Sequence, residues 1–312
     1  MRTKTLGHSG LEVSAVGLGC MNFGMMNDQT ETDRVVATAL DCGVNFFDVA
    51  DIYGGANHKA EAMLGKALGD KRNEVIVATK FGAGGGGGLP GGGKADYIVK
   101  AVESSLKLLG TDYIDLYQHH FPDAETPIDE TMRALDDLVQ QGKVRFIGCS
   151  NYSGEQLAEA NGFAIGNDSS RYTSAQNRYS LLTRTIEQDL IPVAEREQVG
   201  ILPYFPLESG LLTGKYKQDV KPGADTRFGK WAGGGHFASD KRYAIVEQLR
   251  AYGDEIGRSV LEIAIGWLVA QPTVSSVIAG VTKPEQIEQN VAAADWIPTD
   301  EQVNRISELA AL

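Results

Sequence analysis

In Asn45-Phe46-Phe47-Asp48-Val49-Ala50-Asp51-Ile52-Tyr53, a short apolar run is followed at once by an acid and then by a phenol. Two later stretches have the same form: the run 75–79 leads to Lys80, and the run 113–118 leads to His119 and His120. Short apolar runs bounded by polar residues are typical of buried strands. Helix-like stretches separate these runs, so strands and helices alternate along the chain.

The same alternation extends over the whole sequence. We expect strands at 16–19, 45–48, 74–79, 113–118, 144–149, 174–176, 201–204 and 276–279, and helices at 31–42, 59–68, 96–109, 127–141, 153–160, 186–198, 241–256, 259–270 and 284–292. A β-hairpin is expected at 2–13. This order predicts an α/β protein, a single (β/α)₈ TIM barrel over residues 1–312 with an N-terminal hairpin and long loops on the C-terminal face, rather than a doubly wound sheet.

Helix starts and long loops refine this outline. Thr126 is expected to cap a helix with Pro127 at its first position, and Ser259 begins a capping-box pattern. Residues 82–93 are nearly all glycine, and residues 221–239 are rich in glycine with interspersed aromatic side chains. Loops of this length are usually functional or disordered, and both follow strands at the expected active face.

Composition narrows the class of protein. The 312 residues are 42% apolar and 22% charged, as in ordinary globular enzymes, and the net charge of −12 argues against nucleic acid as a partner. No stretch approaches the roughly 20 apolar residues of a membrane span, and the first residues lack the apolar core of a secretory signal. Cys20, Cys42 and Cys149 are widely spaced, without a pattern that suggests metal binding. We therefore expect free thiols, a cytoplasmic protein and no membrane partner.

The strand ends carry a set of residues suited to proton transfer. A barrel gathers its catalytic residues where the strands end, so Asp48, Tyr53, Lys80 and His120 are expected to meet. An ammonium about 4 Å from a phenol favours the phenolate by roughly 4 kcal/mol, which would bring the pKa of Tyr53 toward 7 at most. Asp48 would hold Lys80 charged, and His120 would orient a substrate carbonyl.

Each of these residues also has an ordinary interpretation. Taken singly, Asp48 is a loop cap, Lys80 a solvated charge at a strand end, and Tyr53 a packing aromatic. Neighbouring residues on a strand point to opposite faces, so His119 and His120 cannot both serve one site, and alternation alone leaves open which one does. Convergence of all four is what favours the functional interpretation.

Two segments could bind phosphate. Residues 82–87 formally satisfy a G-x-G-x-x-G pattern, but more glycine follows where a dinucleotide site needs a helix, so we interpret them as a loop near the substrate. Residues 277–285 run from a strand into a helix, and Lys283 adds a positive charge at the helix start. An ordinary capped strand–helix junction is the alternative for this second segment.

The longer motifs resemble those of the aldo-keto reductase superfamily, close to its bacterial and plant branch. Residues 6–19 are similar to its N-terminal hairpin and first strand. Residues 47–54 contain its D-x-A-x-x-Y-G motif, and residues 110–120 match the strand that carries its histidine, in a register that selects His120. The resemblance covers essentially the whole chain. It implies a (β/α)₈ fold and NADPH-dependent, reversible reduction of aldehydes or ketones, with Tyr53 as the acid of a tetrad completed by Asp48, Lys80 and His120.

The resemblance also implies a set of cofactor residues. The nicotinamide amide would be bound by Ser150, Asn151 and Gln176, and Tyr204 would stack on the nicotinamide ring. The pyrophosphate would be surrounded by Leu207, Ser209, Gly210 and Lys215, and the adenosine 2′-phosphate would be held by Gly280, Thr282, Lys283, Gln286 and Asn290. The site would be completed by Gly19, Cys20, Met21 and Asp48. Gln286 stands where many relatives have arginine, and Gly280-Val281 where the animal branch has Lys-Ser. These departures weaken a strict preference for NADP and leave NAD possible.

The resemblance is less specific about the substrate and about partners. Phe23, Phe81, Phe121 and Trp231 are expected to supply an apolar wall for the aldehyde or ketone. A lyase that forms a Schiff base on Lys80 is an alternative, although an ion pair with Asp48 would oppose it. A second alternative is a nucleotide-binding, redox-sensing regulatory subunit, since some superfamily members resemble potassium-channel subunits. The sequence leaves the physiological substrate and the oligomeric state open.

Overall fold

The barrel strands of the computed structural model all run parallel, and the structure describes residues 1–55, 59–84, 91–217 and 239–311. The strands are β3 (Val16–Gly19), β4 (Phe46–Asp48), β5 (Ile76–Phe81), β6 (Ile114–His119), β7 (Val144–Ser150), β8 (Tyr172–Gln176), β9 (Gly200–Ile201) and β10 (Val277–Gly280). They form an eight-stranded sheet in the order β10-β3-β4-β5-β6-β7-β8-β9. The predicted (β/α)₈ architecture is confirmed.

Backbone hydrogen bonds close the sheet between its first and last strands. The Ile201 N–H donates to the Thr273 carbonyl at 2.8 Å, and the Ser275 N–H donates to the Ile201 carbonyl at 3.0 Å. A further bond joins the Ile278 N–H to the Pro203 carbonyl at 3.0 Å. The strands therefore form a ring whose C-terminal ends share one face, where the loops that carry function in such barrels lie.

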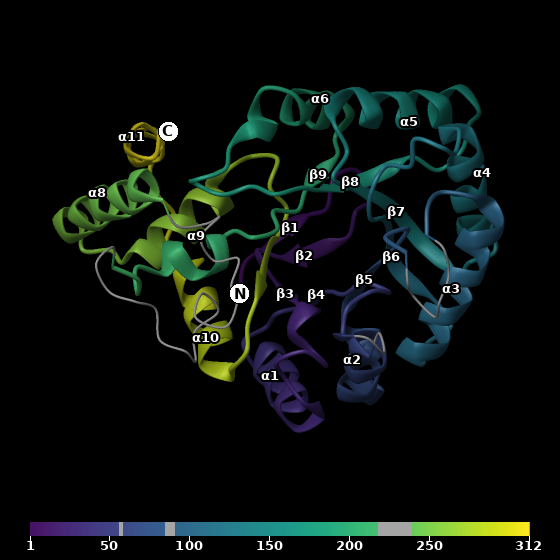
Figure 1. The fold of residues 1–312 in the computed structure, drawn as a ribbon, viewed down its shortest axis with the longest axis horizontal. Coiled ribbons are helices and arrows are strands. Elements are labelled where there is room, and N and C mark those ends of the chain that lie inside the picture. The colour runs from purple at the N-terminus through teal and green to yellow at the C-terminus, as the bar shows by residue number, and fades with distance from the viewer. Residues whose placement is uncertain (56–58, 85–90, 218–238, 312) are drawn as a thin grey trace.

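Helices surround the barrel (Figure 1). They are α1 (Gln29–Asp41), α2 (Ala60–Leu68), α3 (Ala95–Leu109), α4 (Ile128–Gln140), α5 (Gly154–Gly166), α6 (Leu190–Glu197), α8 (Asp240–Ile256), α9 (Val260–Ala270), α10 (Pro284–Ala293) and α11 (Asp300–Leu309). Shorter 3₁₀ helices are η1 (Cys20–Asn22), η3 (Gly69–Glu74), η5 (Thr185–Glu187) and η6 (Glu208–Thr213). Among the described residues, no helix is both long enough and apolar enough to cross a membrane.

The predicted hairpin packs against residues of the barrel strands. Its strands β1 (Thr3–Thr5) and β2 (Glu12–Ser14) pair antiparallel. Leu6, Leu11 and Val13 form one buried cluster with side chains of the barrel strands, including Phe46 and Leu116. A second, larger cluster fills the layer between the strands and the helices. This packing leaves the C-terminal ends of the strands for polar residues.

Helix α4 differs from its prediction. It begins at Ile128, with Pro127 as the N-cap and no side-chain cap. The Thr126 hydroxyl instead donates to Asp123 at 2.6 Å, so the predicted cap at Thr126 is wrong. A nearby acceptor outside the helix has displaced a local interaction that the sequence pattern favoured.

Other differences concern element lengths. The predicted helix at 186–198 divides into η5 and α6, α5 continues to Gly166, and β9 is shorter than the predicted strand 201–204. Helix α11 was not predicted, although a Thr299–Gln302 capping box marks its start. The Ser259 capping box at α9 is confirmed. Residues 85–90 and 218–238, which include much of the two long loops and Trp231, lie outside the described residues.

Candidate active site

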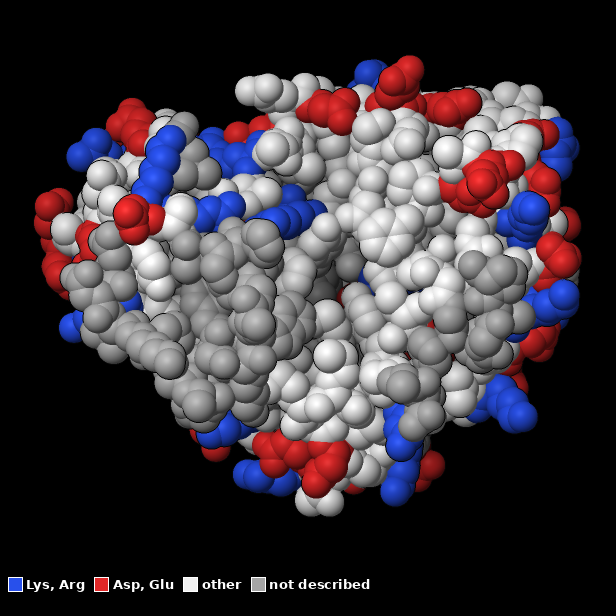
Figure 2. Space-filling view, in the orientation of Figure 1, with Lys and Arg blue, Asp and Glu red and all other residues white. Residues whose placement is uncertain are grey.

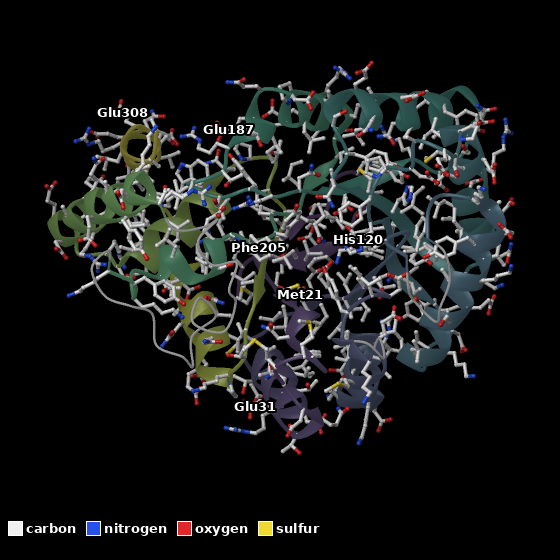
Figure 3. All side chains as sticks on the ribbon, viewed as in Figure 1. Met21, Glu31, His120, Glu187, Phe205 and Glu308 are labelled. Carbon is white, nitrogen blue, oxygen red and sulfur yellow. The ribbon has the colours of Figure 1, made fainter. Side chains whose placement is uncertain are left out.

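The four residues expected at the strand ends lie together. Asp48 is the last residue of β4, Lys80 is the second-last of β5, His120 directly follows β6, and Tyr53 lies in the loop after β4. Asp48, Tyr53 and His120 line one pocket, whereas Lys80 is fully buried behind it. Three separate strands therefore bring an acid, an amine, a phenol and an imidazole to the mouth of the barrel. Figure 3 places His120 near the centre of this view of the molecule, close to Met21 and Phe205.

Lys80 is held as a cation by fixed groups. Its ammonium lies 2.7 Å from Asp48 Oδ2, with side chains only 0% and 3% exposed, and donates to the Val49 carbonyl at 2.9 Å. Burial by itself lowers the pKa of Lys80, but Asp48 and Tyr53 together outweigh it, and the pKa is raised above 10.5. A Schiff-base nucleophile must be a neutral amine, so the lyase alternative is disfavoured.

Tyr53 keeps its proton at neutral pH. The Lys80 ammonium lies 4.9 Å from the centre of the Tyr53 ring, where a cation stabilises a phenolate. Burial nevertheless raises the pKa of Tyr53 above 10, because it outweighs Lys80, whose charge is opposed by Asp48. The expected shift of this pKa toward 7 is therefore wrong for the free protein. The phenol is therefore protonated, and the nearby ammonium can stabilise the phenolate that forms when the proton leaves.

His120 is neutral. Burial, followed by the charge of Lys80, lowers its pKa to about 3. Its ring lies edge-on to Tyr53 at 6.0 Å and stacks on Phe121 at 4.7 Å. Its Nδ1 atom has no hydrogen-bond partner among the described residues. A neutral imidazole can donate one hydrogen bond to a carbonyl oxygen without competing for the proton of Tyr53.

The structure also shows which of the two adjacent histidines belongs to the pocket. His119 is 1% exposed, its Nδ1 lies 2.7 Å from the Tyr152 hydroxyl, and its ring stacks on Phe81 at 4.9 Å. Burial lowers its pKa to about 4. His119 therefore packs in the interior, and His120 is the histidine that lines the pocket, as the motif register predicts.

A layer of amides surrounds Asp48. Gln176 donates to Asp48 Oδ1 at 2.8 Å, and Gln118 donates to the same oxygen at 3.4 Å. The Ser150 hydroxyl donates to the Gln176 carbonyl at 2.8 Å. Gln118 was not among the expected site residues, although it lies two residues before His120 on the same face of its strand. Alternation along β6 was the signal that could have identified it.

Asn151 connects this layer to the aromatic residue predicted to stack on a nicotinamide. Its amide donates to the His120 carbonyl at 2.9 Å, and its Oδ1 accepts from the Tyr204 hydroxyl at 2.7 Å. Asn151 has a left-handed backbone with φ of 62°. The end of β7 is thus bonded to both the histidine and the tyrosine.

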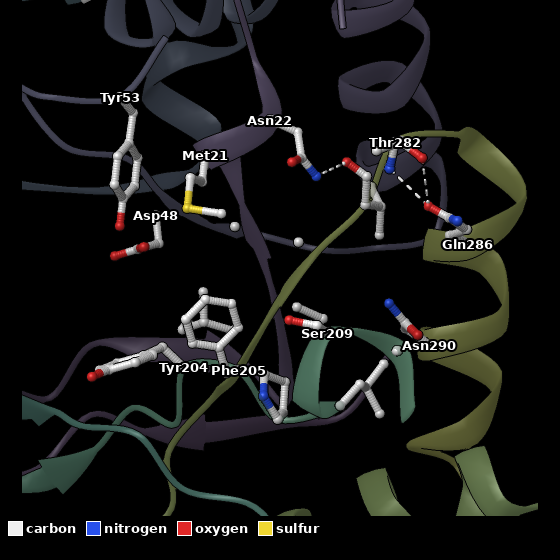
Figure 4. Close-up of a pocket in the computed structure, with 18 of the residues that line it drawn as sticks. Met21, Asn22, Asp48, Tyr53, Tyr204, Phe205, Ser209, Thr282, Gln286 and Asn290 are labelled. Carbon is white, nitrogen blue, oxygen red and sulfur yellow. Dashed lines mark hydrogen bonds between the residues drawn. The ribbon is translucent and has the colours of Figure 1, made fainter. Parts of the chain in front are cut away.

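A pocket of about 650 Å³ extends away from this cluster (Figure 4). Figure 2 shows the surface hollowed near the centre of this face. The predicted site residues that line the pocket are Gly19, Met21, Asp48, Tyr53, His120, Phe121, Ser150, Asn151, Gln176, Tyr204, Leu207, Ser209, Gly210, Lys215, Gly280, Thr282, Gln286 and Asn290. Other residues that line the pocket had no predicted role; they are Asn22, Met26, Phe205, Pro206, Thr213, Leu261, Ile278, Ala279, Val281 and Gln289. Most of these are apolar or lack a recognisable motif.

Some predicted site residues lie elsewhere. Phe23 and Phe81 are fully buried in the core, so they do not form the expected substrate wall, and Cys20 is also buried outside the pocket lining. Apolar residues next to strand ends can point into the helix layer, and the sequence does not reveal this. Lys283 is exposed at the start of α10 and does not line the pocket. Trp231 lies outside the described residues.

An unusual turn contributes to the wall of the pocket. Glu208, Ser209 and Gly210 have φ values of 47°, 57° and 98°. Each non-glycine residue in this region costs on the order of 1 kcal/mol or more. The Ser209 hydroxyl is buried and has no partner among the described residues, and Ser209, Gly210 and Lys215 line the pocket together.

This donor set fits a dinucleotide. A hydroxyl without a partner and a lysine close to the Ser209–Gly210 turn suit phosphate oxygens, whereas Tyr204, Ser150 and Asn151 suit an amide-bearing aromatic ring beside Tyr53. Near the start of α10, the Thr282 N–H donates to Gln286 Oε1 at 2.7 Å, so Gln286 caps the amide at this position. Polar groups at both ends and apolar groups between them match a long ligand with two polar ends.

The fold and this site define a (β/α)₈ barrel with ionisable residues gathered at one end of a long pocket. Residues 15–311 match the family model described as Aldo/keto reductase family. The chain is 36% identical over 310 residues to the probable voltage-gated potassium channel subunit beta of Arabidopsis thaliana, covering 96% of this chain and 92% of that protein. The chain therefore belongs to the aldo/keto reductase family.

Other relatives carry oxidoreductase names. The uncharacterized oxidoreductase YrpG of Bacillus subtilis (strain 168) is 34% identical over 313 residues, covering 96% of this chain and 93% of that protein. The probable aldo-keto reductase 1 of Glycine max is 34% identical over 297 residues, covering 92% and 83%. Membership in this family indicates an oxidoreductase with a nicotinamide cofactor.

Proposed function

We propose that the protein is an NADPH-dependent oxidoreductase that reduces aldehyde or ketone carbonyls to alcohols, reversibly, with Tyr53 as the general acid. The observation that carries this proposal is the buried Asp48–Lys80 pair, which holds an ammonium 4.9 Å from the ring of a protonated phenol that lines the pocket.

Each residue has a distinct part in the proposed reaction. Tyr53 donates its proton to the carbonyl oxygen and becomes a phenolate. The Lys80 ammonium stabilises that phenolate. Because the interaction is stronger in the transition state, where the negative charge develops, than in the ground state, it lowers the activation barrier. His120 is neutral and orients the carbonyl by donating a hydrogen bond. Asp48 keeps the ammonium charged and fixed in place.

The remaining residues would hold the cofactor. Bound nicotinamide would supply a hydride, which carries both electrons and the hydrogen that the carbonyl carbon gains, while the proton from Tyr53 goes to the oxygen. Ser150, Asn151, Gln176 and Tyr204 would bind its amide and ring, and Ser209, Gly210 and Lys215 would bind the phosphates. Thr282, Lys283, Gln286 and Asn290 would hold the adenosine end. NADPH is the proposed cofactor because Lys283 is exposed near that end and suits an additional phosphate; NADH remains the alternative, and the affinities of both should be compared.

Tyr53→Phe tests the proposal directly. Phenylalanine retains the ring that packs on His120 but cannot supply a proton, so turnover should fall by about 10²–10⁴-fold. Binding of NADPH should persist. The measurements are NADPH oxidation with a panel of neutral aldehydes and ketones, and fluorescence titration of NADPH. Turnover that survives in this variant would refute the assignment of Tyr53 as the acid.

A second candidate function is a nucleotide-binding, redox-sensing regulatory subunit without significant turnover. Similarity to proteins named as potassium channel subunits, such as the 37% identical relative in Oryza sativa subsp. japonica, favours it. The same panel separates the two functions. A regulatory subunit would bind NADPH, but for every carbonyl in the panel its rate of NADPH oxidation would equal that of the Tyr53→Phe variant. The rate of a reductase would exceed that of the variant by orders of magnitude.

A further inference from the structure

The left-handed turn in the wall of the pocket contains a buried carboxylate. Glu208 is fully buried and pairs with the Arg178 guanidinium. It also accepts hydrogen bonds from Arg242 at 2.9 Å, from the Ser180 hydroxyl at 2.7 Å and from the Thr183 hydroxyl at 2.9 Å. Four side chains from two separate segments therefore hold one carboxylate.

These donors connect the turn to distant parts of the chain. Arg178 and its two hydroxyl-bearing neighbours follow β8, whereas Arg242 is in the first turn of α8. Arg242 also donates to the Leu182 carbonyl at 3.3 Å. Burial by itself raises the pKa of Glu208, but the bond and charge of Arg178 together with the bonds from Ser180 and Thr183 outweigh it, and the pKa is lowered. The carboxylate is thus ionised, and with two guanidinium groups the cluster has one excess positive charge.

The backbone at Glu208 adopts a conformation that its local sequence does not favour. Phe205, Glu208 and Ser209 have φ values of 50°, 47° and 57°. Only Gly210, with φ of 98°, adopts a positive φ without a steric penalty. A strained conformation persists only where surrounding contacts impose it. The four donors to the Glu208 carboxylate are contacts of this kind.

The turn presents its polar groups to the pocket. Figure 4 shows Ser209 among the residues around the pocket, on the side of Phe205 and Asn290. The Ser209 hydroxyl is buried and has no partner among the described residues. A Cβ built on Gly210 would lie 3.4 Å from Lys215 Nζ, so the Lys215 ammonium is close to the turn. A hydroxyl without a partner and an ammonium beside it suit an anion.

We propose that Glu208, Arg178 and Arg242 form a clamp that positions the Ser209–Gly210 turn for the diphosphate of a dinucleotide. The clamp residues are positioning residues, because none of the three lines the pocket. Through Arg242, the clamp also couples binding of the diphosphate to the start of α8. This inference rests on the proposed function and deepens it by naming what holds the phosphate turn in place.

Arg242→Ala is the primary test. Arg242 is the clamp residue that α8 contributes, and its substitution leaves every pocket-lining residue unchanged. NADPH should bind at least tenfold more weakly and dissociate correspondingly faster, whereas kcat at saturating NADPH should stay within about twofold of the unmodified protein. Arg242→Lys, which keeps the charge but loses the forked geometry, should recover part of the affinity. If Arg242→Ala does not fold, Arg242→Lys takes its place in every comparison.

Arg184→Ala is the matched control. Arg184 bonds Glu187 through two nitrogens at 2.8 Å and 2.9 Å and also donates to the Ser307 carbonyl, but neither Arg184 nor Glu187 lines the pocket. Its loss should lower the Tm without a change in the Kd for NADPH. A Kd that is the same for Arg184→Ala and Arg242→Ala would overturn the clamp.

A double-mutant cycle separates positioning from general stability. In a Ser209→Ala background, Arg242→Ala should weaken NADPH by less than twofold, because the hydroxyl that the clamp positions is already absent. Fully additive losses would overturn the inference. If the unmodified protein binds neither NADPH nor NADH, the proposed function itself fails, and the clamp fails with it. Binding by the unmodified protein with no selective effect at Arg242 refutes only the clamp.

Discussion

Two buried carboxylates, Asp48 in the lining of the pocket and Glu208 behind the turn that contributes Ser209 to it, use the same ion-pair chemistry for different purposes. Asp48 meets a lysine that is as buried as itself, with side chains 3% and 0% exposed. Glu208 meets Arg178 and Arg242, whose side chains are 33% and 17% exposed. The first pair fixes a charge beside a phenol, and the second cluster fixes the path of the backbone.

The choice of cation follows from these purposes. A lysine ammonium is a compact charge, which suits a site that must stabilise one phenolate oxygen. An arginine guanidinium is a planar fork, which can bond a carboxylate and a neighbouring carbonyl at once, as Arg242 does with Glu208 and Leu182. Ion pairs of this kind are weak evidence for stability, because burying the charges costs free energy. Their value in this protein lies in placing other groups.

The largest effect on stability is expected from Asp48→Asn. This change leaves the Lys80 ammonium fully buried without its counter-charge, which typically lowers the free energy of unfolding by about 3–5 kcal/mol. Urea unfolding of the variant measures the loss. The double variant Asp48→Asn/Lys80→Met removes both charges and should recover much of this stability, although it should remain inactive. A double variant no more stable than Asp48→Asn would contradict this account of the pair.

A smaller effect on stability is expected from Glu208→Gln. The two arginines lose their shared carboxylate, but both are partly exposed and can be hydrated, so the loss should be about 1–3 kcal/mol. The same urea experiment should therefore rank Asp48→Asn as the more destabilising of the two. The opposite ranking would show that exposure of the cations does not explain the difference between the two sites.

The smallest effect is expected from Asp51→Asn, at a buried carboxyl without a salt bridge among the described residues. Asp51 is 6% exposed, and the Tyr97 hydroxyl donates to it at 3.2 Å. Burial raises its pKa from 3.8 to about 6. The folded protein thus binds an extra proton between pH 4 and pH 6, and stability falls as pH rises through this window. The amide should therefore stabilise the protein by about 1–2 kcal/mol above pH 6.

The pH dependence of this last effect provides its check. At pH 4, Asp51 is protonated in the folded state and about half protonated in the unfolded state, whose pKa is 3.8, so most of the gain from Asp51→Asn should disappear. Thermal unfolding at pH 4 and at pH 7.5 gives the comparison. An equal difference in Tm at the two pH values would mean that ionisation of Asp51 is not the cause.

Much of the barrel could be predicted because its strands are buried on both faces and its helices end at recognisable signals. Glycine at the left-handed end of α3, Gly110 with φ of 66°, is one such signal. Where the prediction of a cap was wrong, another acceptor close in sequence competed for the same donor: the Thr126 hydroxyl bonds Asp123, three residues earlier, and not the backbone of α4. Helix α11 was missed because its single fully buried residue, Ile306, gives a weak apolar pattern.

The candidate site was partly predictable for a similar reason. Asp48, Lys80 and His120 occupy strand ends, and parallel strands in one barrel must end on one face. The sequence did not reveal that burial raises the pKa of Tyr53 by more than the Lys80 charge lowers it, because this pKa depends on every group around the phenol. Nor did it identify Gln118 or Glu208, whose partners are distant in sequence.

The alternation of strands and helices, and with it the face on which the polar strand ends gather, follows from local sequence patterns, because hydrophobic periodicity and capping act over a few residues. Three features follow instead from the folded arrangement: His119 packs in the interior, Phe23 and Phe81 belong to the core, and Glu208 bonds a helix far along the chain. These outcomes depend on burial and on contacts between distant segments, and a linear pattern contains neither.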